Sequence, residues 1–136
     1  MTAVMKPAPL VTADTRSFWD ACARGVLTYQ RCAACGHVQF PARPFCTECR
    51  AADPVEERSA GVGAIHSHTT VHRAPTPAFK DDVPYVIALV DLDEGFRLMA
   101  NLRDCPPAEL RIGLRVRVVF EPLAGGGALP QVRPLE

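Results

Sequence analysis

Four cysteines arranged as two closely spaced pairs constrain the fold of this chain more than any other feature. The first pair is Cys32 and Cys35, and the second is Cys46 and Cys49. Two residues between the members of a pair let the backbone curl so that both sulfur atoms face one ion. Two such knuckles supply four thiolates, the closed tetrahedral set of structural zinc. We therefore predict a zinc ribbon over residues 26–54 that holds a structural Zn²⁺ ion.

Iron in the same four-thiolate cage is the alternative to zinc. With four protein ligands the ion keeps no open position for water, so we expect it to take no part in catalysis. The first residues of the chain contain no apolar segment of the kind found in signal peptides, and we expect a cytoplasmic location. Cysteines in that compartment favour metal ligation over disulfides. The longest apolar run, residues 85–90, is too short to span a membrane.

The rest of the pattern predicts a mainly β protein with one short N-terminal helix. Residues 1–25 are expected to form a flexible lead-in and this helix, which is capped by Asp14 or Thr15, runs to Arg24 and is stopped by Gly25. Phe18 would lie on its buried face beside Ala21 and Cys22, and the Phe18-Trp19 dipeptide either docks the helix on its own domain or meets a partner. Short strands at residues 26–30 and 37–40 would flank the first cysteine pair.

Residues 55–136 carry five segments with strand character, at residues 64–72, 85–92, 96–102, 115–121 and 129–133. Residues 93–95 have the turn chemistry of a hairpin. Five short strands in this order predict a small Greek-key barrel, and the OB-fold is the obvious candidate.

No convincing catalytic set is visible in the sequence. His66, His68 and His72 fall at even offsets and would share one face of a regular strand, where a second metal site is conceivable. No carboxylate or cysteine stands beside them, so we interpret them as polar barrel residues. Cys105 lacks a local base that would make it a nucleophile. The absence of such a set favours a binding or accessory subunit over an independent enzyme.

Charge bears on the choice of partner. The sequence has 15 basic side chains (Lys and Arg) and 15 acidic ones (Asp and Glu). Domains that hold nucleic acid mainly through its phosphates usually carry a basic excess, so we expect no nucleic-acid partner. Zinc ribbons and OB-folds both serve in that role, however, and a module that binds single-stranded nucleic acid is the alternative function.

The ordered set of motifs resembles the acyl-CoA-associated OB-fold family that has an N-terminal rubredoxin-like zinc ribbon and is catalogued as a domain of unknown function. The matching stretches are Phe18-Trp19, Gly25-x-Leu27, Gln30-x-Cys32-x-x-Cys35-Gly36, Phe40-Pro41-x-Arg43-x-x-Cys46-x-x-Cys49, Gly61-x-Gly63, Pro84-Tyr85-Val86, Glu109-Leu110-Arg111-Ile112-Gly113 and Val118-x-Phe120-Glu121. The chain departs from the family at Arg50, where a glycine is commoner, at Ala42, where a proline is usual, and at His68, where an aromatic residue is usual.

The resemblance implies a partner. Members of this family are similar to small subunits of thiolase-superfamily enzymes: thiolases, acyltransferases and lipid-transfer-protein-like aldolases that cleave steroid side-chain CoA thioesters. The large subunit carries the chemistry, and the small one stabilises it and helps to hold the CoA thioester. By analogy, the chain is expected to be non-catalytic and to form a two-plus-two hetero-oligomer.

A bound CoA thioester would need cations for its phosphates and an aromatic or apolar face for its adenine. Candidate residues for these contacts are Arg43 in the ribbon and Arg73, Phe79 and Lys80 in the first long loop of the barrel. That loop and the turn at residues 125–127 form the edge at which OB-folds usually bind ligands.

Overall fold

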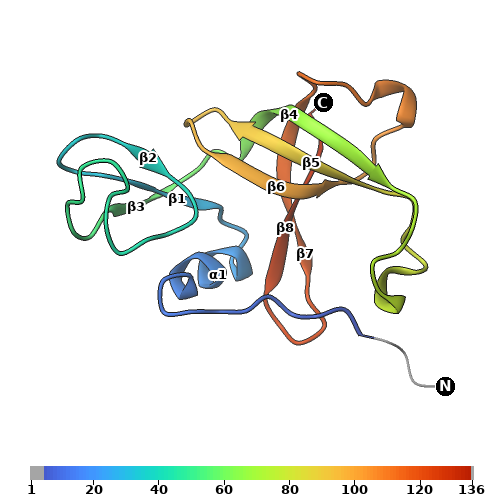
Figure 1. Cartoon of the computed structure of the whole chain (residues 1–136), viewed down its shortest axis with the longest axis horizontal. Helices are drawn as coiled ribbons and strands as arrows, with labels where there is room; N and C mark the ends of the chain where they lie inside the picture. Colours follow the sequence, from blue (N-terminus) through green and yellow to red (C-terminus); the bar gives the residue numbers. More distant parts are fainter. Residues whose placement is uncertain (1–4, 136) are drawn as a thin grey trace.

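The fold combines one helix, a small ribbon sheet and a closed five-stranded barrel (Figure 1). The computed structural model describes residues 5–135. Residues 1–4 of the expected lead-in and residue 136 of the expected barrel domain lie outside the described residues. None of the helices in the described part of the chain has the length and hydrophobicity needed to cross a bilayer.

Helix α1 (Arg16–Ala23) forms where the sequence predicts it. Thr15 is the N-cap residue, but its hydroxyl accepts a hydrogen bond from the Thr12 N–H instead of capping the helix. At the other end the N–H groups of Gly25 and Val26 donate to the carbonyls of Cys22 and Ala21, which is a Schellman closure. The inner face buries Ala21 and Cys22 completely, as expected, whereas Phe18 is only partly buried.

The ribbon sheet contains β1 (Thr28–Arg31), β2 (Val38–Gln39) and β3 (Val55–Arg58), in the order β2-β1-β3. Strand β3 follows the expected boundary between residues 54 and 55 in sequence, but it pairs with β1 and not with the barrel. Glu57 explains this pairing: its carboxylate accepts hydrogen bonds from the Tyr29 hydroxyl and the Arg31 guanidinium. The ribbon sheet therefore extends to Arg58.

The barrel strands confirm the predicted five-stranded OB-fold. They are β4 (Val62–Val71), β5 (Tyr85–Leu92), β6 (Arg97–Leu102), β7 (Arg115–Pro122) and β8 (Ala128–Pro134). They close in the order β4-β5-β6-β8-β7. Short 3-10 helices lie at Pro77–Phe79 in the β4–β5 loop and at Pro107–Glu109 between β6 and β7.

Two places in the barrel show how its strands fit together: the close backbone contact at Gly63 and the seam between β6 and β8. Gly63 pairs with Leu92 of β5 and with Val116 of β7, and a side chain there would collide with the backbone carbonyl of Asp91. The seam between β6 and β8 is parallel and contains a single paired position, Leu102 with Val132. The barrel therefore closes with little backbone pairing at that seam.

A bulge in β4 corrects the prediction that three histidines share a face. The register with β5 shifts between Ile65 and Ser67, so His66 is the extra residue. His66 turns to Asp91, with 3.3 Å between Nδ1 and Oδ2, whereas His68 pairs with the buried Ala88. Because paired residues share a face of the sheet, His66 and His68 lie on opposite faces.

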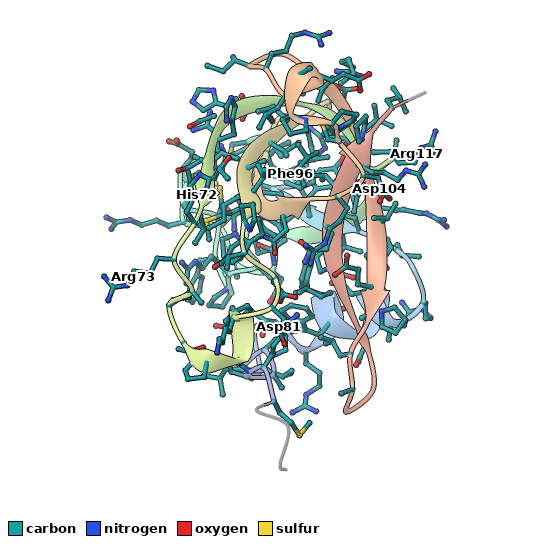
Figure 2. All side chains as sticks on the ribbon, turned by 90° about the vertical axis from the view of Figure 1, so that its right-hand side faces the viewer. His72, Arg73, Asp81, Phe96, Asp104 and Arg117 are labelled. Carbon is teal, nitrogen blue, oxygen red and sulfur yellow. The ribbon has the colours of Figure 1, made fainter. Side chains whose placement is uncertain are left out.

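One hydrophobic core joins the ribbon to the barrel. Leu27 and Tyr29 of the ribbon belong to the same buried cluster as the inward side chains of the barrel. The Tyr29 ring stacks on Phe96 with centroids 4.9 Å apart, and Phe40 lies 5.4 Å from Phe96. Phe96 lies in the interior of the molecule (Figure 2). Phe18 of α1 extends this aromatic array through its contact with Phe40 at 5.3 Å.

Candidate metal centre and binding surfaces

The two cysteine pairs sit on two backbone knuckles of the same design. In the first, Cys32 N–H donates to the His37 carbonyl and Gly36 N–H donates to the Cys32 carbonyl, both at 2.9 Å. In the second, Arg50 N–H donates to the Cys46 carbonyl at 3.0 Å. Gly36 and Arg50 occupy equivalent positions and both have positive φ, 78° and 66°. Both knuckles thus turn through a left-handed residue just after their second cysteine.

The knuckles bring the four sulfur atoms of the predicted site together. All four Sγ atoms lie within 4.8 Å of one another. The Cys32–Cys49 and Cys35–Cys46 sulfur pairs are 3.5 Å and 3.6 Å apart. A tetrahedral zinc with Zn–S bonds of about 2.3 Å requires sulfur separations of roughly 3.8 Å. The donor set therefore fits Zn²⁺ held by Cys32, Cys35, Cys46 and Cys49.

Hydrogen bonds from backbone amides lower the pKa values of two of these four thiols. The Cys35 N–H points at the Cys32 sulfur from 3.4 Å and lowers the pKa of that thiol to about 6. The Cys49 N–H, 3.5 Å from the Cys46 sulfur, is the main cause that lowers the pKa of Cys46. Thiolates are the form that binds metal, so these backbone amides favour the ligating state of Cys32 and Cys46.

Two glutamines support the second knuckle, and the sequence analysis missed them. The buried Gln39 side chain donates to the Phe45 carbonyl at 3.1 Å and accepts from the Thr47 N–H at 2.9 Å. Gln30, paired with Gln39 across the sheet, bonds the backbone of Arg43 in both directions. Two amide side chains on neighbouring strands beside a cysteine pair were the signal that could have revealed this support.

The two remaining thiols lie in unreactive surroundings. Cys22 is fully buried, and desolvation raises its pKa to about 11. Burial is also the main cause of the raised pKa of Cys105. Neither thiol is therefore a thiolate nucleophile at neutral pH. Among the described residues, the four ribbon cysteines form the one group of three or more His, Cys, Asp or Glu side chains close enough to share an ion.

The four candidate CoA-binding residues do not converge on one site. Arg43 lines a hollow of about 360 Å³ between the ribbon and the β5–β6 turn, together with His37 and Arg97. Phe79 lines a separate groove of about 480 Å³ at the far edge of the barrel. Arg73 and Lys80 are exposed and line neither, and Figure 2 shows Arg73 pointing away from the molecule.

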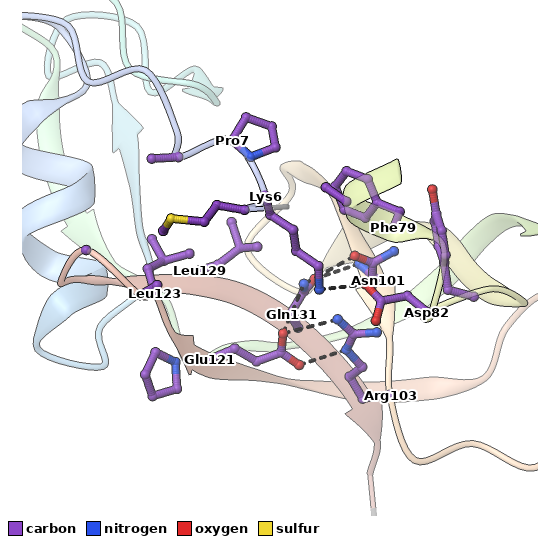
Figure 3. Close-up of a pocket in the computed structure, with 17 residues that line it drawn as sticks. Lys6, Pro7, Phe79, Asp82, Asn101, Arg103, Glu121, Leu123, Leu129 and Gln131 are labelled. Carbon is purple, nitrogen blue, oxygen red and sulfur yellow. Dashed lines mark hydrogen bonds and ion pairs between the residues drawn. The ribbon is translucent and has the colours of Figure 1, made fainter. Parts of the chain in front are cut away.

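The groove that contains Phe79 lies between the β4–β5 loop and the β7–β8 hairpin (Figure 3). Its floor is a connected polar network. Arg103 donates to both oxygens of Glu121, at 2.7 Å and 3.2 Å, and this contact is the main cause that lowers the pKa of Glu121. Gln131 links Glu121 to Asn101 through its side-chain amide. The edge at which an OB-fold is expected to bind ligands therefore contains a groove. The polar side chains on its floor form hydrogen bonds and ion pairs with one another.

Comparison with known proteins matches both halves of this architecture. A model described as the rubredoxin-like zinc ribbon domain of ChsH2 matches residues 19–55, and a model described as the C-terminal OB-fold domain of ChsH2 matches residues 56–121. A DUF35 domain-containing scaffold protein from Methanothermobacter thermautotrophicus is 40% identical over 112 residues, which cover 82% of this chain and 84% of that protein. The chain belongs to the DUF35 family.

Two further DUF35-related proteins are named as parts of enzymes. A solved structure described as the Ltp2-ChsH2(DUF35) aldolase contains a chain that is 35% identical and superposes with a TM-score of 0.84, covering 93% of this chain and 98% of that one. A probable enoyl-CoA hydratase alpha subunit from Thermomonospora curvata is 35% identical over 130 residues. That match covers 96% of this chain and 40% of the hydratase subunit.

Proposed function

We propose that this DUF35 chain is a non-catalytic accessory subunit that binds and stabilises a thiolase-like acyl-CoA enzyme and helps to hold its CoA thioester. The likeness to the DUF35 chain of the Ltp2-ChsH2 aldolase carries this proposal, because it extends over 98% of that chain. The CoA thioester is suggested by the name of the enoyl-CoA hydratase relative. In the proposed assembly the large subunit supplies the catalytic groups.

The chemistry of the described residues supports an accessory role. The four cysteine thiolates would occupy all four coordination positions of a zinc ion and would leave no position for a substrate. The Cys22 and Cys105 thiols have raised pKa values. A subunit of this kind contributes binding surface and stability to a complex.

Exposed apolar side chains on the ribbon support contact with a protein partner. Phe45 is 57% exposed beside the second knuckle, and Val55, at the start of β3, is 48% exposed. Aromatic side chains are enriched in protein interfaces. The alternative nucleic-acid-binding function would call for stacking platforms on the barrel strands. Outward positions of β5 and β6 instead pair Leu89 with Met99 and Asp91 with Arg97.

The partner proposal is tested by co-expressing the chain with a thiolase-like protein encoded beside it. We expect the two to co-elute from size-exclusion chromatography, with a mass by light scattering that matches two copies of each. Phe45→Ser should weaken co-elution, whereas Ile112→Ser, which changes an even more exposed apolar side chain in the loop before β7, should not. Separate elution of the unmodified chains would refute the proposal.

Arg43 is the residue through which we propose contact with a CoA phosphate. Its neighbours in the hollow, His37 and Arg97, include a second cation, although Arg97 also bonds Asp91 at 2.7 Å. Arg43→Ala should weaken binding of a CoA thioester to the complex in titration calorimetry. Arg58→Ala, an exposed arginine on β3, is the matched control. Unchanged affinity of the Arg43 variant would reject this contact.

A further inference from the structure

The chain's own N-terminal segment forms one side of the groove at the ligand edge of the barrel. Met5, Lys6, Pro7 and Ala8 all contribute to its lining, opposite the β4–β5 loop and the β7–β8 hairpin (Figure 3). These two loops are the ones with which OB-folds commonly bind ligands. The N-terminal segment therefore borders the position where a ligand of the barrel would enter, and its residues 5–8 are themselves exposed.

Lys6 anchors this segment through two contacts. Its Nζ lies 2.6 Å from Asp82 Oδ2 and 5.6 Å from the centroid of the Phe79 ring. Figure 3 shows the lysine side chain reaching down past Phe79 to Asp82. Glu121 on the floor adds a second carboxylate, whose lowered pKa is due mainly to Arg103 and in small part to the charge of Lys6. The groove therefore offers negative charge and an aromatic face to an incoming cation.

The backbone of the segment is suited to a groove of this kind. Residues 6–9 read Lys-Pro-Ala-Pro, and each proline biases the residue before it toward an extended conformation. Within the described chain, residues 5–8 form no regular secondary structure, and no hydrogen bond ties their backbone to the barrel. Extended proline-rich segments are recognised elsewhere by aromatic grooves. Side-chain contacts alone hold the segment, so another segment of the same chemistry can replace it.

We propose that this groove is a recognition site for an extended lysine–proline segment and that the chain's own residues 5–8 occupy its Asp82 and Phe79 contacts in cis through Lys6. We call this competing native segment the plug. Any other occupant of the groove competes with it, and loss of the Lys6 cation opens the groove. This inference does not depend on the identity of the partner enzyme, so its failure would leave the proposed accessory function standing.

A peptide titration of the full chain tests the proposal. The probe is an acetylated hexapeptide with the sequence of residues 5–10, followed by nuclear magnetic resonance of the labelled protein. In the Lys6→Glu chain the new carboxylate is repelled by Asp82 and Glu121, so the plug leaves. We expect this variant to bind the peptide at least about threefold more tightly than the unmodified chain. Equal affinity of the two chains, or no binding by either, would overturn the proposal.

A pair of neighbouring carboxylates provides the matched control. Added to Lys6→Glu, Asp82→Asn should weaken peptide binding at least about threefold relative to Asp81→Asn. Asp81 is exposed and does not line the groove. An equal loss from both changes would overturn the assignment of Asp82. Backbone ¹⁵N relaxation should also show residues 5–8 ordered in the unmodified chain and mobile in Lys6→Glu; a mobile segment in the unmodified chain would contradict a plug.

Discussion

At the scale of single residues, the second knuckle of the ribbon uses an unusual amino acid. Arg50 adopts φ 66°, in the left-handed region, at the position equivalent to Gly36. Side chains with a Cβ are disfavoured there by about 1–2 kcal/mol. The missing glycine was evident from the sequence, but only the structure shows that the backbone keeps the conformation that glycine would favour. The ribbon tolerates this strain because the surrounding hydrogen bonds fix the turn.

Replacing Arg50 with glycine should therefore stabilise the ribbon. We expect Arg50→Gly to raise the free energy of unfolding of the metal-loaded protein by about 0.5 kcal/mol, because relief of strain exceeds the added chain entropy. Denaturant unfolding with zinc present measures this change. Arg58→Gly, in the extended strand β3, should instead lower it by about 0.5–1 kcal/mol. If both variants lose stability equally, Arg50 is not strained.

At the scale of the elements, the β6–β8 seam depends on one side chain. Leu102 and Val132 are the single paired position of this parallel contact. The Gln131 side-chain oxygen accepts a hydrogen bond from the Asn101 N–H at 2.7 Å, and the Arg103 N–H donates to the Val132 carbonyl, also at 2.7 Å. Gln131 is only 2% exposed. The buried side-chain amide of Gln131 thus takes the place of a backbone hydrogen bond that β6 and β8 do not form.

Gln131→Leu should open this seam locally. The Asn101 N–H would lose its partner, which costs about 1–3 kcal/mol for a buried donor. Hydrogen exchange should show a faster-exchanging Asn101 amide, whereas the Arg103 amide, bonded to backbone, should stay protected. An Asn101 amide that exchanges at the native rate in the variant would show that Gln131 does not close the seam.

The helix and the strands also show which features could be predicted from the sequence and which could not. Helix α1, the five barrel strands and the four-cysteine set follow from local signals: a Gly25 stop, alternating apolar residues and cysteine spacing. The pairing of β3 with β1 escaped prediction because Glu57 acts through distant partners, Tyr29 and Arg31. The bulge at His66 was missed because one extra residue leaves no compositional trace. Long-range contacts determine these features, so a local pattern cannot reveal them.

At the scale of the whole molecule, an aromatic array couples the ribbon to the barrel. Phe96, at the β5–β6 turn, contacts Tyr29 and Phe40 of the ribbon, and Phe18 extends the array to α1. Leu27 and Tyr29 also belong to the core of the barrel. The metal centre and the barrel are therefore expected to unfold together.

Calorimetry of the Phe96→Ala variant tests that coupling. The unmodified metal-loaded protein should melt in one transition, and chelation should lower the stability of the barrel as well as that of the ribbon. Phe96→Ala should cost about 3–5 kcal/mol and separate the melting into two transitions, of which chelation removes only the first. Phe120→Ala, which removes a ring packed within the barrel, should leave a single transition. Two transitions in the unmodified protein would contradict the coupling.

The closed barrel limits how another protein can join this molecule. A closed sheet offers little free edge that a foreign strand could extend by hydrogen bonding, and in this barrel the sparsely paired β6–β8 seam is the exception. In the described chain the free edges belong to β2 and β3, on either side of β1 in the ribbon. Both edges exist only while the cysteine knuckles hold the ribbon in shape. Association by strand addition at either ribbon edge would therefore require a metallated ribbon, and metal supply would govern such assembly as directly as it governs folding.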